Sequence, residues 1–452
     1  MVDSDAGGSV ESSPLPSSSV LPLITVEEWR VSASTKLSKT ATLTADTSSL
    51  NILRSGSRWS EIRGKILEAF VPEGFPTSVT PDYVPFQIWD SLQGLSTYIR
   101  SMLSTQALLS AIGVGEKSAT VIGATFQWFL RDFTGMLGGI LFTFYQGSNL
   151  DNNAKMWRLV ADFMNDLGML MDLISPLFPS ALVLIVCLGS LSRSFTGVAS
   201  GATRAALTQH FSLENNAADI SAKESSQETI ATMVGMALGM LLAHLTRGYP
   251  LAVWVSFLLL TFFHMYANYK AVRCLSLTTL NSRRGSILLQ NFMKNGQVVT
   301  PQQVSKMEHI FPSLANPWSS SNGISLHRRV YLGVKVSGLN HHDMVELSGS
   351  TISHYKKANY LLLERDGVVR AIIHKQATPA DILQSFIHAL VLAIITEQSK
   401  AVHIESRLWM DENYNDFITK LRSAGWEVER LLIPSIVWRA QWDFVSAEQK
   451  IK

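Results

Sequence analysis

Hydrophobic residues dominate three stretches in the middle of the chain, residues 174–191, 229–245 and 251–269. The third, LAVWVSFLLLTFFHMYANY, begins directly after Pro250 and carries most of its aromatic residues towards its end. A helix needs about 20 predominantly apolar residues to cross a bilayer, and each stretch approaches that length. The pattern therefore predicts either membrane-spanning helices or the buried helices of an apolar soluble bundle.

Helical spacing of apolar residues also marks the region before these stretches. Segment 119–146 is apolar but is interrupted by Arg131 and Asp132, which in a spanning helix would have to face the protein interior or a polar cavity. Gly113-x-Gly115 lacks the third glycine of a dinucleotide-binding loop and is predicted to be a turn between helices. The predicted helices of this region are residues 59–70, 86–111, 119–146 and 151–173.

After about residue 300 the pattern becomes that of a soluble α/β module. Asp366-Gly367 stands between two apolar runs and is a strong signal for a β-hairpin. His341-His342-Asp343 lies in a predicted loop and is interpreted as solvated surface rather than a metal site. The predicted strands are residues 328–336, 360–364, 368–374 and 426–432, and the predicted helices are residues 378–395 and 411–424.

These patterns predict a mainly α fold, with an apolar, membrane-embedded helical domain followed by a smaller α/β C-terminal domain. The first 57 residues are rich in serine and threonine and are predicted to be disordered. They lack the basic start and long apolar core of a secretory signal. The predicted divisions are residues 1–57, 58–298 for the helical domain, 299–324 for a helix and linker, and 325–452 for the C-terminal domain.

Basic residues without acidic ones follow the third apolar stretch: Lys270, Arg273, Arg283 and Arg284. By the positive-inside rule, this end faces the cytosol, or the stroma if the membrane belongs to a plastid. The sequence predicts a membrane location and leaves the organelle open.

The composition agrees with an apolar protein, because 46% of the residues are hydrophobic and only 16% are charged. A formal net charge of +2 gives no reason to expect a nucleic acid as partner. Cys187 and Cys274 form no metal-binding pattern, and no P-loop, nucleophile elbow or HExxH sequence occurs. We therefore expect a membrane as partner, and neither a cofactor nor a metal ion.

Residues 190–240 form a polar segment between the first two apolar stretches. The simpler interpretation is a solvated connector, and the alternative is a protected cleft or a membrane-surface loop. Upstream, Asp162 and Asp166 are expected on one helical face, with Arg158, Arg193 or Arg204 as their basic partner. The candidate functional polar residues are Arg131, Asp132, Asp162, Asp166, Arg204, Asn216, Asp219, Lys223, Gln227 and Glu228.

Two glycine pairs flank this charged region. Gly197-x-x-x-Gly201 and Gly235-x-x-x-Gly239 both fit the small-residue pattern by which membrane helices pack closely. They are candidate helix-packing positions, which would serve within the protein or against a partner.

Four blocks of the chain resemble the root UVB-sensitive (RUS) family: PEGFPTSVTPDYVPFQIWDSLQG, STQALLSAIGVG, KMWRLVADFMNDLG and HFSLENNAADISAKESSQET. They occur in the family's order, and the resemblance covers roughly residues 70–292. It implies a plant-type member of a family with no established biochemical activity. It also implies an association with seedling development, UV-B responses, vitamin B6 homeostasis or auxin transport, and cooperation with other members of the family.

We expect a membrane-associated, non-enzymatic scaffold or adaptor in plant development. One alternative is a small-molecule transporter that uses the charged residues of the helical domain. A second alternative is an enzyme of unknown reaction, in which Glu224 or Glu228 beside Lys223 would supply the acid or base.

Overall fold

The computed structural model places two compact units, Met1–Ser78 and Val79–Lys452. The residues that it describes are 24–31, 37–46, 49–54, 62, 66–112, 121–310, 326–347, 355–356, 358–396, 401–434 and 436–442.

The first unit contains an antiparallel sheet in the order β1-β2-β3. Its strands are β1 (Ile24–Val31), β2 (Leu37–Asp46) and β3 (Ser49–Arg54). The sequence analysis predicted disorder for residues 1–57, whereas these three stretches form β-strands. The threonines of β2 explain the difference, since Thr40, Thr42 and Thr44 are β-branched and favour extended backbone.

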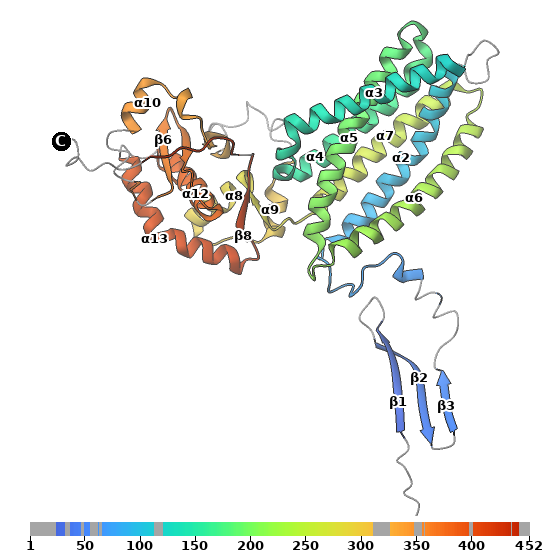
Figure 1. Ribbon diagram of the computed structural model, residues 1–452, viewed down its shortest axis with the longest axis horizontal. Coiled ribbons are helices and arrows are strands. Elements are labelled where there is room, and N and C mark those ends of the chain that lie inside the picture. The colour runs from blue at the N-terminus through green and yellow to red at the C-terminus, as the bar shows by residue number, and fades with distance from the viewer. Residues whose placement is uncertain are drawn as a thin grey trace, which may run out of the picture. The chain divides into compact units, whose positions relative to one another are not determined.

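The second unit begins with six long helices that lie side by side (Figure 1). Helix α2 packs against α4, α6 and α7, whereas α5 packs against α3 and α4. The helices are α2 (Tyr83–Ala111), α3 (Val121–Gln146), α4 (Ala154–Ile174), α5 (Leu182–Phe211), α6 (Ala217–Leu245) and α7 (Pro250–Cys274). The turn predicted at Gly113-x-Gly115 lies outside the described residues.

Helix α5 differs from the predicted helix over residues 174–191. Pro176 and Pro179 lie in two short 3₁₀ turns, Ser175–Leu177 and Pro179–Ala181, and the α-helix begins only at Leu182. Proline supplies no backbone N–H and interrupts an α-helix interior, which accounts for the shift. The polar segment 190–240 is not a connector along its length, because it forms most of α5 and most of α6.

Three described helical segments are long and apolar enough to cross a membrane: Pro179–Phe211, Ala217–Leu245 and Pro250–Cys274. In each segment, no more than 28% of the apolar stretch that could cross the membrane is buried within the protein. Helix α3 also exposes a row of large apolar side chains, among them Phe126, Phe133, Ile140 and Phe144. The outer surface of the bundle is therefore apolar to an extent that is typical of lipid-facing helices.

The remaining elements form the α/β part of the second unit. They are β4 (Thr279–Asn281), α8 (Ser282–Asn295), α9 (Pro301–Met307), β5 (Val330–Leu332), α10 (His341–Glu346), β6 (Tyr360–Arg365), β7 (Val368–Ile373), α12 (Pro379–Ile395), α13 (Val402–Ser423) and β8 (Glu427–Leu432). One sheet has the order β5-β7-β6, and β4 pairs with β8 in a second, parallel sheet.

The predicted hairpin is confirmed, since β6 and β7 pair from Arg365↔Val368 outwards. Asp366 and Gly367 both adopt positive φ, as a two-residue hairpin turn of this kind requires. The strand predicted over residues 328–336 is shorter, because Gly333 turns the chain with φ 67 after Leu332.

Helix α8 shares its core with the C-terminal elements. Leu288 and Phe292 belong to one buried cluster with Phe386 and Phe417. The sequence analysis divided the chain at residue 298, just after α8, and the contacts of α8 reach across that division. Strand β4 also reaches across it, since it pairs with β8.

Candidate functional site

A polar pocket of about 150 Å³ lies inside the helical bundle, between α2, α4, α5 and α6. Helix α2 contributes polar side chains at positions 87, 90, 91, 93, 97 and 98, so that a polar stripe of this helix faces the cavity. The lining residues are Phe86, Gln87, Asp90, Ser91, Gln93, Gly94, Thr97, Tyr98, Arg158, Asp162, Asn165, Ser200, Arg204, Leu207, Glu224, Gln227, Glu228 and Ala231.

One arginine of the pocket lies between two carboxylates. Arg158 Nη2 is 2.5 Å from Asp90 Oδ1, and Arg158 Nε is 3.9 Å from Asp162 Oδ2. Asp162 also accepts a hydrogen bond from Asn268 Nδ2 at 2.6 Å. Helices α2, α4 and α7 are therefore joined by polar contacts behind the pocket.

The second arginine has a similar arrangement. Arg204 Nη1 donates to Glu228 Oε2 at 2.7 Å, and Arg204 Nε is 3.7 Å from Glu224 Oε2. Glu224 also accepts from Gln87 Nε2 at 2.7 Å and from Thr208 Oγ1 at 3.3 Å. The Glu224 side chain is 7% exposed and that of Glu228 is 46% exposed, so the pocket runs from a buried end to an open one.

A second polar layer lies deeper in the bundle. Gln93, at the pocket wall, has its Nε2 2.9 Å from His264 Nε2. His264 Nδ1 is 2.9 Å from Asp166 Oδ2, and Asp166 Oδ1 accepts from Arg100 Nη1 at 2.7 Å. Arg100 and His264 are fully buried. A chain of hydrogen-bonding side chains thus connects the pocket with the most buried arginine of the bundle described here.

The predicted site residues separate into groups. Asp162, Arg204, Gln227 and Glu228 line the pocket, and Asp166 lies in the deeper layer. The polar segment therefore contributes to a protected cleft, which was the alternative to a solvated connector.

The other candidates lie elsewhere. Asn216 accepts from Ser212 Oγ at the start of α6, and Lys223 pairs with Asp219 at 3.4 Å. On α3, Arg131 stacks over the Trp128 ring at 4.4 Å. Asp132, beside it, is exposed.

The expected arginine partners are correct only in part. Arg158 lies 3.9 Å from Asp162, but Arg193 pairs with Asp172 at 2.6 Å and Arg204 pairs with Glu228 at 2.7 Å. Asp166 is paired with Arg100, which sequence reasoning did not single out. The polar stripe of α2 was the available signal, because Asp90, Gln93 and Arg100 recur at helical spacing.

The glycine pairs also have different surroundings. A Cβ atom at Gly235 would lie 2.7 Å from Tyr98 Cβ, and one at Gly239 would lie 2.9 Å from Ile99 O, so both glycines lie against α2. Gly197 and Gly201 on α5 are exposed, and a Cβ atom there would meet nothing within 4 Å.

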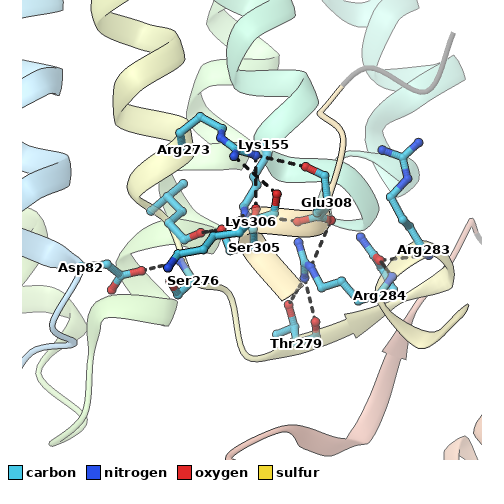
Figure 2. A network of polar contacts seen from close by, with 12 residues as sticks. Asp82, Lys155, Arg273, Ser276, Thr279, Arg283, Arg284, Ser305, Lys306 and Glu308 are labelled. Atoms are coloured by element: carbon cyan, nitrogen blue, oxygen red, sulfur yellow. Dashed lines mark hydrogen bonds and ion pairs between the residues drawn. The ribbon is translucent and has the colours of Figure 1, made fainter. Parts of the chain in front are cut away.

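A separate polar network lies where the bundle meets the α/β part (Figure 2). Lys155 Nζ is 3.1 Å from Glu308 Oε2 and donates to Ser305 Oγ at 3.0 Å. Arg284 Nε donates to Glu308 Oε1 at 3.2 Å, and Arg273 Nη1 donates to the backbone carbonyls of Ser305 and Glu308. Burial raises the pKa of Glu308. The charges of Arg284 and Lys155, together with their hydrogen bonds, lower it by a larger amount, so that its pKa lies below the usual range.

Among the described residues, no group of three His, Cys, Asp or Glu side chains could hold a metal ion. His341 and His342 begin the short helix α10 rather than a loop, and Asp343 beside them pairs with Arg365 at 2.8 Å.

Two family models together match the chain from residue 56 to residue 442. The first, described as a vitamin B6 photo-protection and homoeostasis domain, matches residues 56–296 and contains the pocket. The second, the C-terminal domain of root UVB-sensitive proteins, matches residues 297–442. The chain belongs to the root UVB-sensitive family.

Individual relatives in the RUS family match most of the chain. Root UVB sensitive 3 of Arabidopsis thaliana is 67% identical over 420 residues, which are 93% of this chain and 95% of that protein. RUS family member 1 of Dictyostelium discoideum is 42% identical, over 59% of this chain and 51% of its own length. Root UVB sensitive 2 of Arabidopsis thaliana, named chloroplastic, is 28% identical, over 81% of this chain and 82% of its own length. No solved structure gives a significant match. The names of these families and relatives refer to vitamin B6 and UV-B, and not to auxin transport.

Proposed function

We propose that this RUS-family chain is a membrane-associated carrier for a small polar solute and that it contributes to vitamin B6 homeostasis. The polar pocket is the observation that carries the proposal. Ionised side chains are costly inside apolar helices, and where they occur they usually mark a pathway or a binding site. Here they line a cavity large enough for a small ligand, within a bundle whose outer faces are apolar.

The membrane part of the proposal is tested by carbonate extraction of the expressed protein. Retention in the membrane pellet supports integral helices, and release into the supernatant would contradict a carrier. Protease protection of a C-terminal tag then tests the side on which the α/β part lies. The basic residues after α7 support the cytosolic or stromal side, and the relative named chloroplastic supports a plastid membrane.

The carrier part is tested in vesicles reconstituted with the full chain, by uptake of labelled pyridoxamine, an unphosphorylated form of vitamin B6. We expect uptake above that of protein-free vesicles and a clear reduction with Glu228→Gln, since Glu228 lies at the open end of the pocket. Asp219→Asn changes a carboxylate of the same helix away from the pocket and serves as the control. Uptake equal to that of protein-free vesicles would remove the proposal.

A scaffold or adaptor role is a second candidate, and the exposed stripe with Gly197 and Gly201 supports it. Small residues let a partner helix approach closely, and nothing within the described bundle occupies the space above these two glycines. A partner from the same family is the proposed occupant. Co-purification with root UVB-sensitive proteins should fall when both glycines are changed to leucine, but not for Ser225→Leu on the exposed face of α6. Unchanged co-purification would count against this surface.

A further inference from the structure

Negative charge exceeds positive charge among the side chains that line the pocket. Four carboxylates, Asp90, Asp162, Glu224 and Glu228, face two arginines, Arg158 and Arg204. Each arginine lies between two of the carboxylates. With all six groups ionised, the formal charge of the lining is −2. An empty pocket of this kind is unfavourable at low dielectric, and a positively charged occupant would relieve the repulsion.

The arrangement does not suit a metal ion, since no three metal-ligating side chains converge among the described residues. The carboxylates are instead distributed around a cavity whose lining includes the aromatic rings of Phe86 and Tyr98. Aromatic rings attract organic cations through their faces. A cavity of about 150 Å³ accommodates a molecule of roughly the size of benzene.

Two side chains at the pocket retain capacity for a ligand. The Asp90 side chain is 28% exposed although it is paired with Arg158. Arg158 is 9% exposed, and its Nε, although 3.9 Å from Asp162 Oδ2, donates no hydrogen bond. A ligand with an ammonium group and a nearby acceptor oxygen or nitrogen would use both.

We propose that the pocket selects a small organic cation, a protonated amine carried on a ring or a short chain, and disfavours anions of the same size. This inference rests on the proposed function, because it assumes that the pocket is the solute site. The ammonium group lies at Asp90 and Glu224, and the acceptor group of the ligand meets Arg158 Nε. A phosphorylated solute is excluded by repulsion from the surplus carboxylates.

The test uses three probes of similar size and different charge: benzylamine, benzyl alcohol and benzoate. Binding to the purified full chain in detergent is measured by isothermal titration at pH 7.5. We expect benzylamine to bind at least ten times more tightly than either of the other two, with an affinity that falls as salt is added. Equal affinities, a preference for benzoate, or no binding of benzylamine would each overturn the inference.

Two variants test whether benzylamine binds in this pocket. Asp90→Asn should weaken benzylamine binding at least five-fold while leaving benzyl alcohol unaffected, and Glu214→Gln, an exposed carboxylate in the loop before α6, should change neither. Wild-type selectivity among the three probes stands as a test even if Asp90→Asn does not fold. Tight binding of benzyl alcohol would refute the cation preference but leave a solute pocket in place, whereas the proposed carrier function fails only in the extraction and uptake experiments.

Discussion

Individual charged side chains in the bundle are held by specific partners, and Arg100 is the clearest case. Its side chain is fully buried, and it donates to Asp166 Oδ1 at 2.7 Å and to Thr261 Oγ1 at 3.0 Å. Removing one member of a buried ion pair leaves an uncompensated charge and typically costs about 3–5 kcal/mol. Loss of either partner should therefore destabilise this part of the bundle.

Asp166→Asn should lower the stability of the bundle by an amount in that range, because Arg100 keeps its charge and loses its counter-ion. The fraction of protein that stays monodisperse after heating measures the effect in detergent. Asp219→Asn on α6 is the control and should change stability by less than about 0.5 kcal/mol, as its ion pair is partly exposed. Identical melting of the two variants would contradict a structural role for the pair.

His388 in α12 is buried, with Nδ1 3.0 Å from the Tyr360 hydroxyl and Nε2 3.2 Å from Ser406 Oγ. Burial, with the nearby charges of His403 and Arg407, lowers the pKa of His388 to about 3. Between this pKa and the ordinary value of about 6.5, the unfolded chain binds a proton that the folded chain does not. Stability is therefore complete above about pH 6.5 and is lost as the pH falls.

At pH 5 the loss from this group should be about 2 kcal/mol relative to pH 7.5, from 1.4 kcal/mol per unit of pH. Thermal unfolding of the α/β part at several pH values measures it. His388→Gln retains hydrogen-bonding groups but does not titrate, and it should flatten the pH dependence. A slope that persists in this variant would assign the effect to other groups.

At the scale of helices, close contact between α2 and α6 depends on Gly235 and Gly239. A Cβ atom at position 239 would lie 2.9 Å from the backbone oxygen of Ile99, which cannot move independently of α2. At Gly201 on α5 the same atom would meet open space. Two glycines in the same sequence pattern therefore have opposite packing roles.

Gly239→Ala should destabilise the bundle by about 1–3 kcal/mol through overpacking. Gly201→Ala should leave stability unchanged or raise it by about 0.5–1 kcal/mol, since alanine loses less entropy in a helix. Thermal stability of the two variants in the same detergent separates the cases. Equal destabilisation would contradict the open environment of Gly201.

The helices, the β-hairpin and the apolar surfaces followed from the periodicity of the chain, because these are local patterns. The partners of the charged residues did not follow. Asp166 meets Arg100, which is 66 positions away, and His264, which is 98 positions away. No local spacing encodes which helix packs against which, so the site could be assembled only in part, from Asp162, Arg204, Gln227 and Glu228.

At the scale of the second unit, the bundle and the α/β part are joined through a buried ionic network (Figure 2). Glu308 receives Lys155 from α4 and Arg284 from α8, and its carboxylate is 7% exposed. Its pKa lies below the ordinary value, so these ion pairs contribute stability above the pKa of an unfolded glutamate. That contribution is lost only as the pH falls through the lower pKa of the folded chain.

Glu308→Gln should loosen this junction, since two buried cations lose their common counter-ion. Amide hydrogen exchange should become faster in α9 and β4 and remain unchanged in α6, which does not contact the network. Glu412→Gln, an exposed carboxylate on α13, provides the control. Unaltered exchange in α9 would show that the backbone contacts of Arg273 hold the junction without the carboxylate.

The pairing of β4 with β8 has a consequence for how the chain is made. The hydroxyl of Thr278, just before β4, donates a hydrogen bond to the carboxylate of Glu427 at the start of β8, 149 residues away. During synthesis, the complete bundle, β4 and α8 therefore leave the ribosome well before β8 is made. During that interval Leu280 and Leu288 have no finished core to enter. A premature stop codon between α12 and β8 should therefore leave an intact bundle followed by an incomplete α/β part. The exposed apolar side chains of that part should make it aggregate or depend on chaperones.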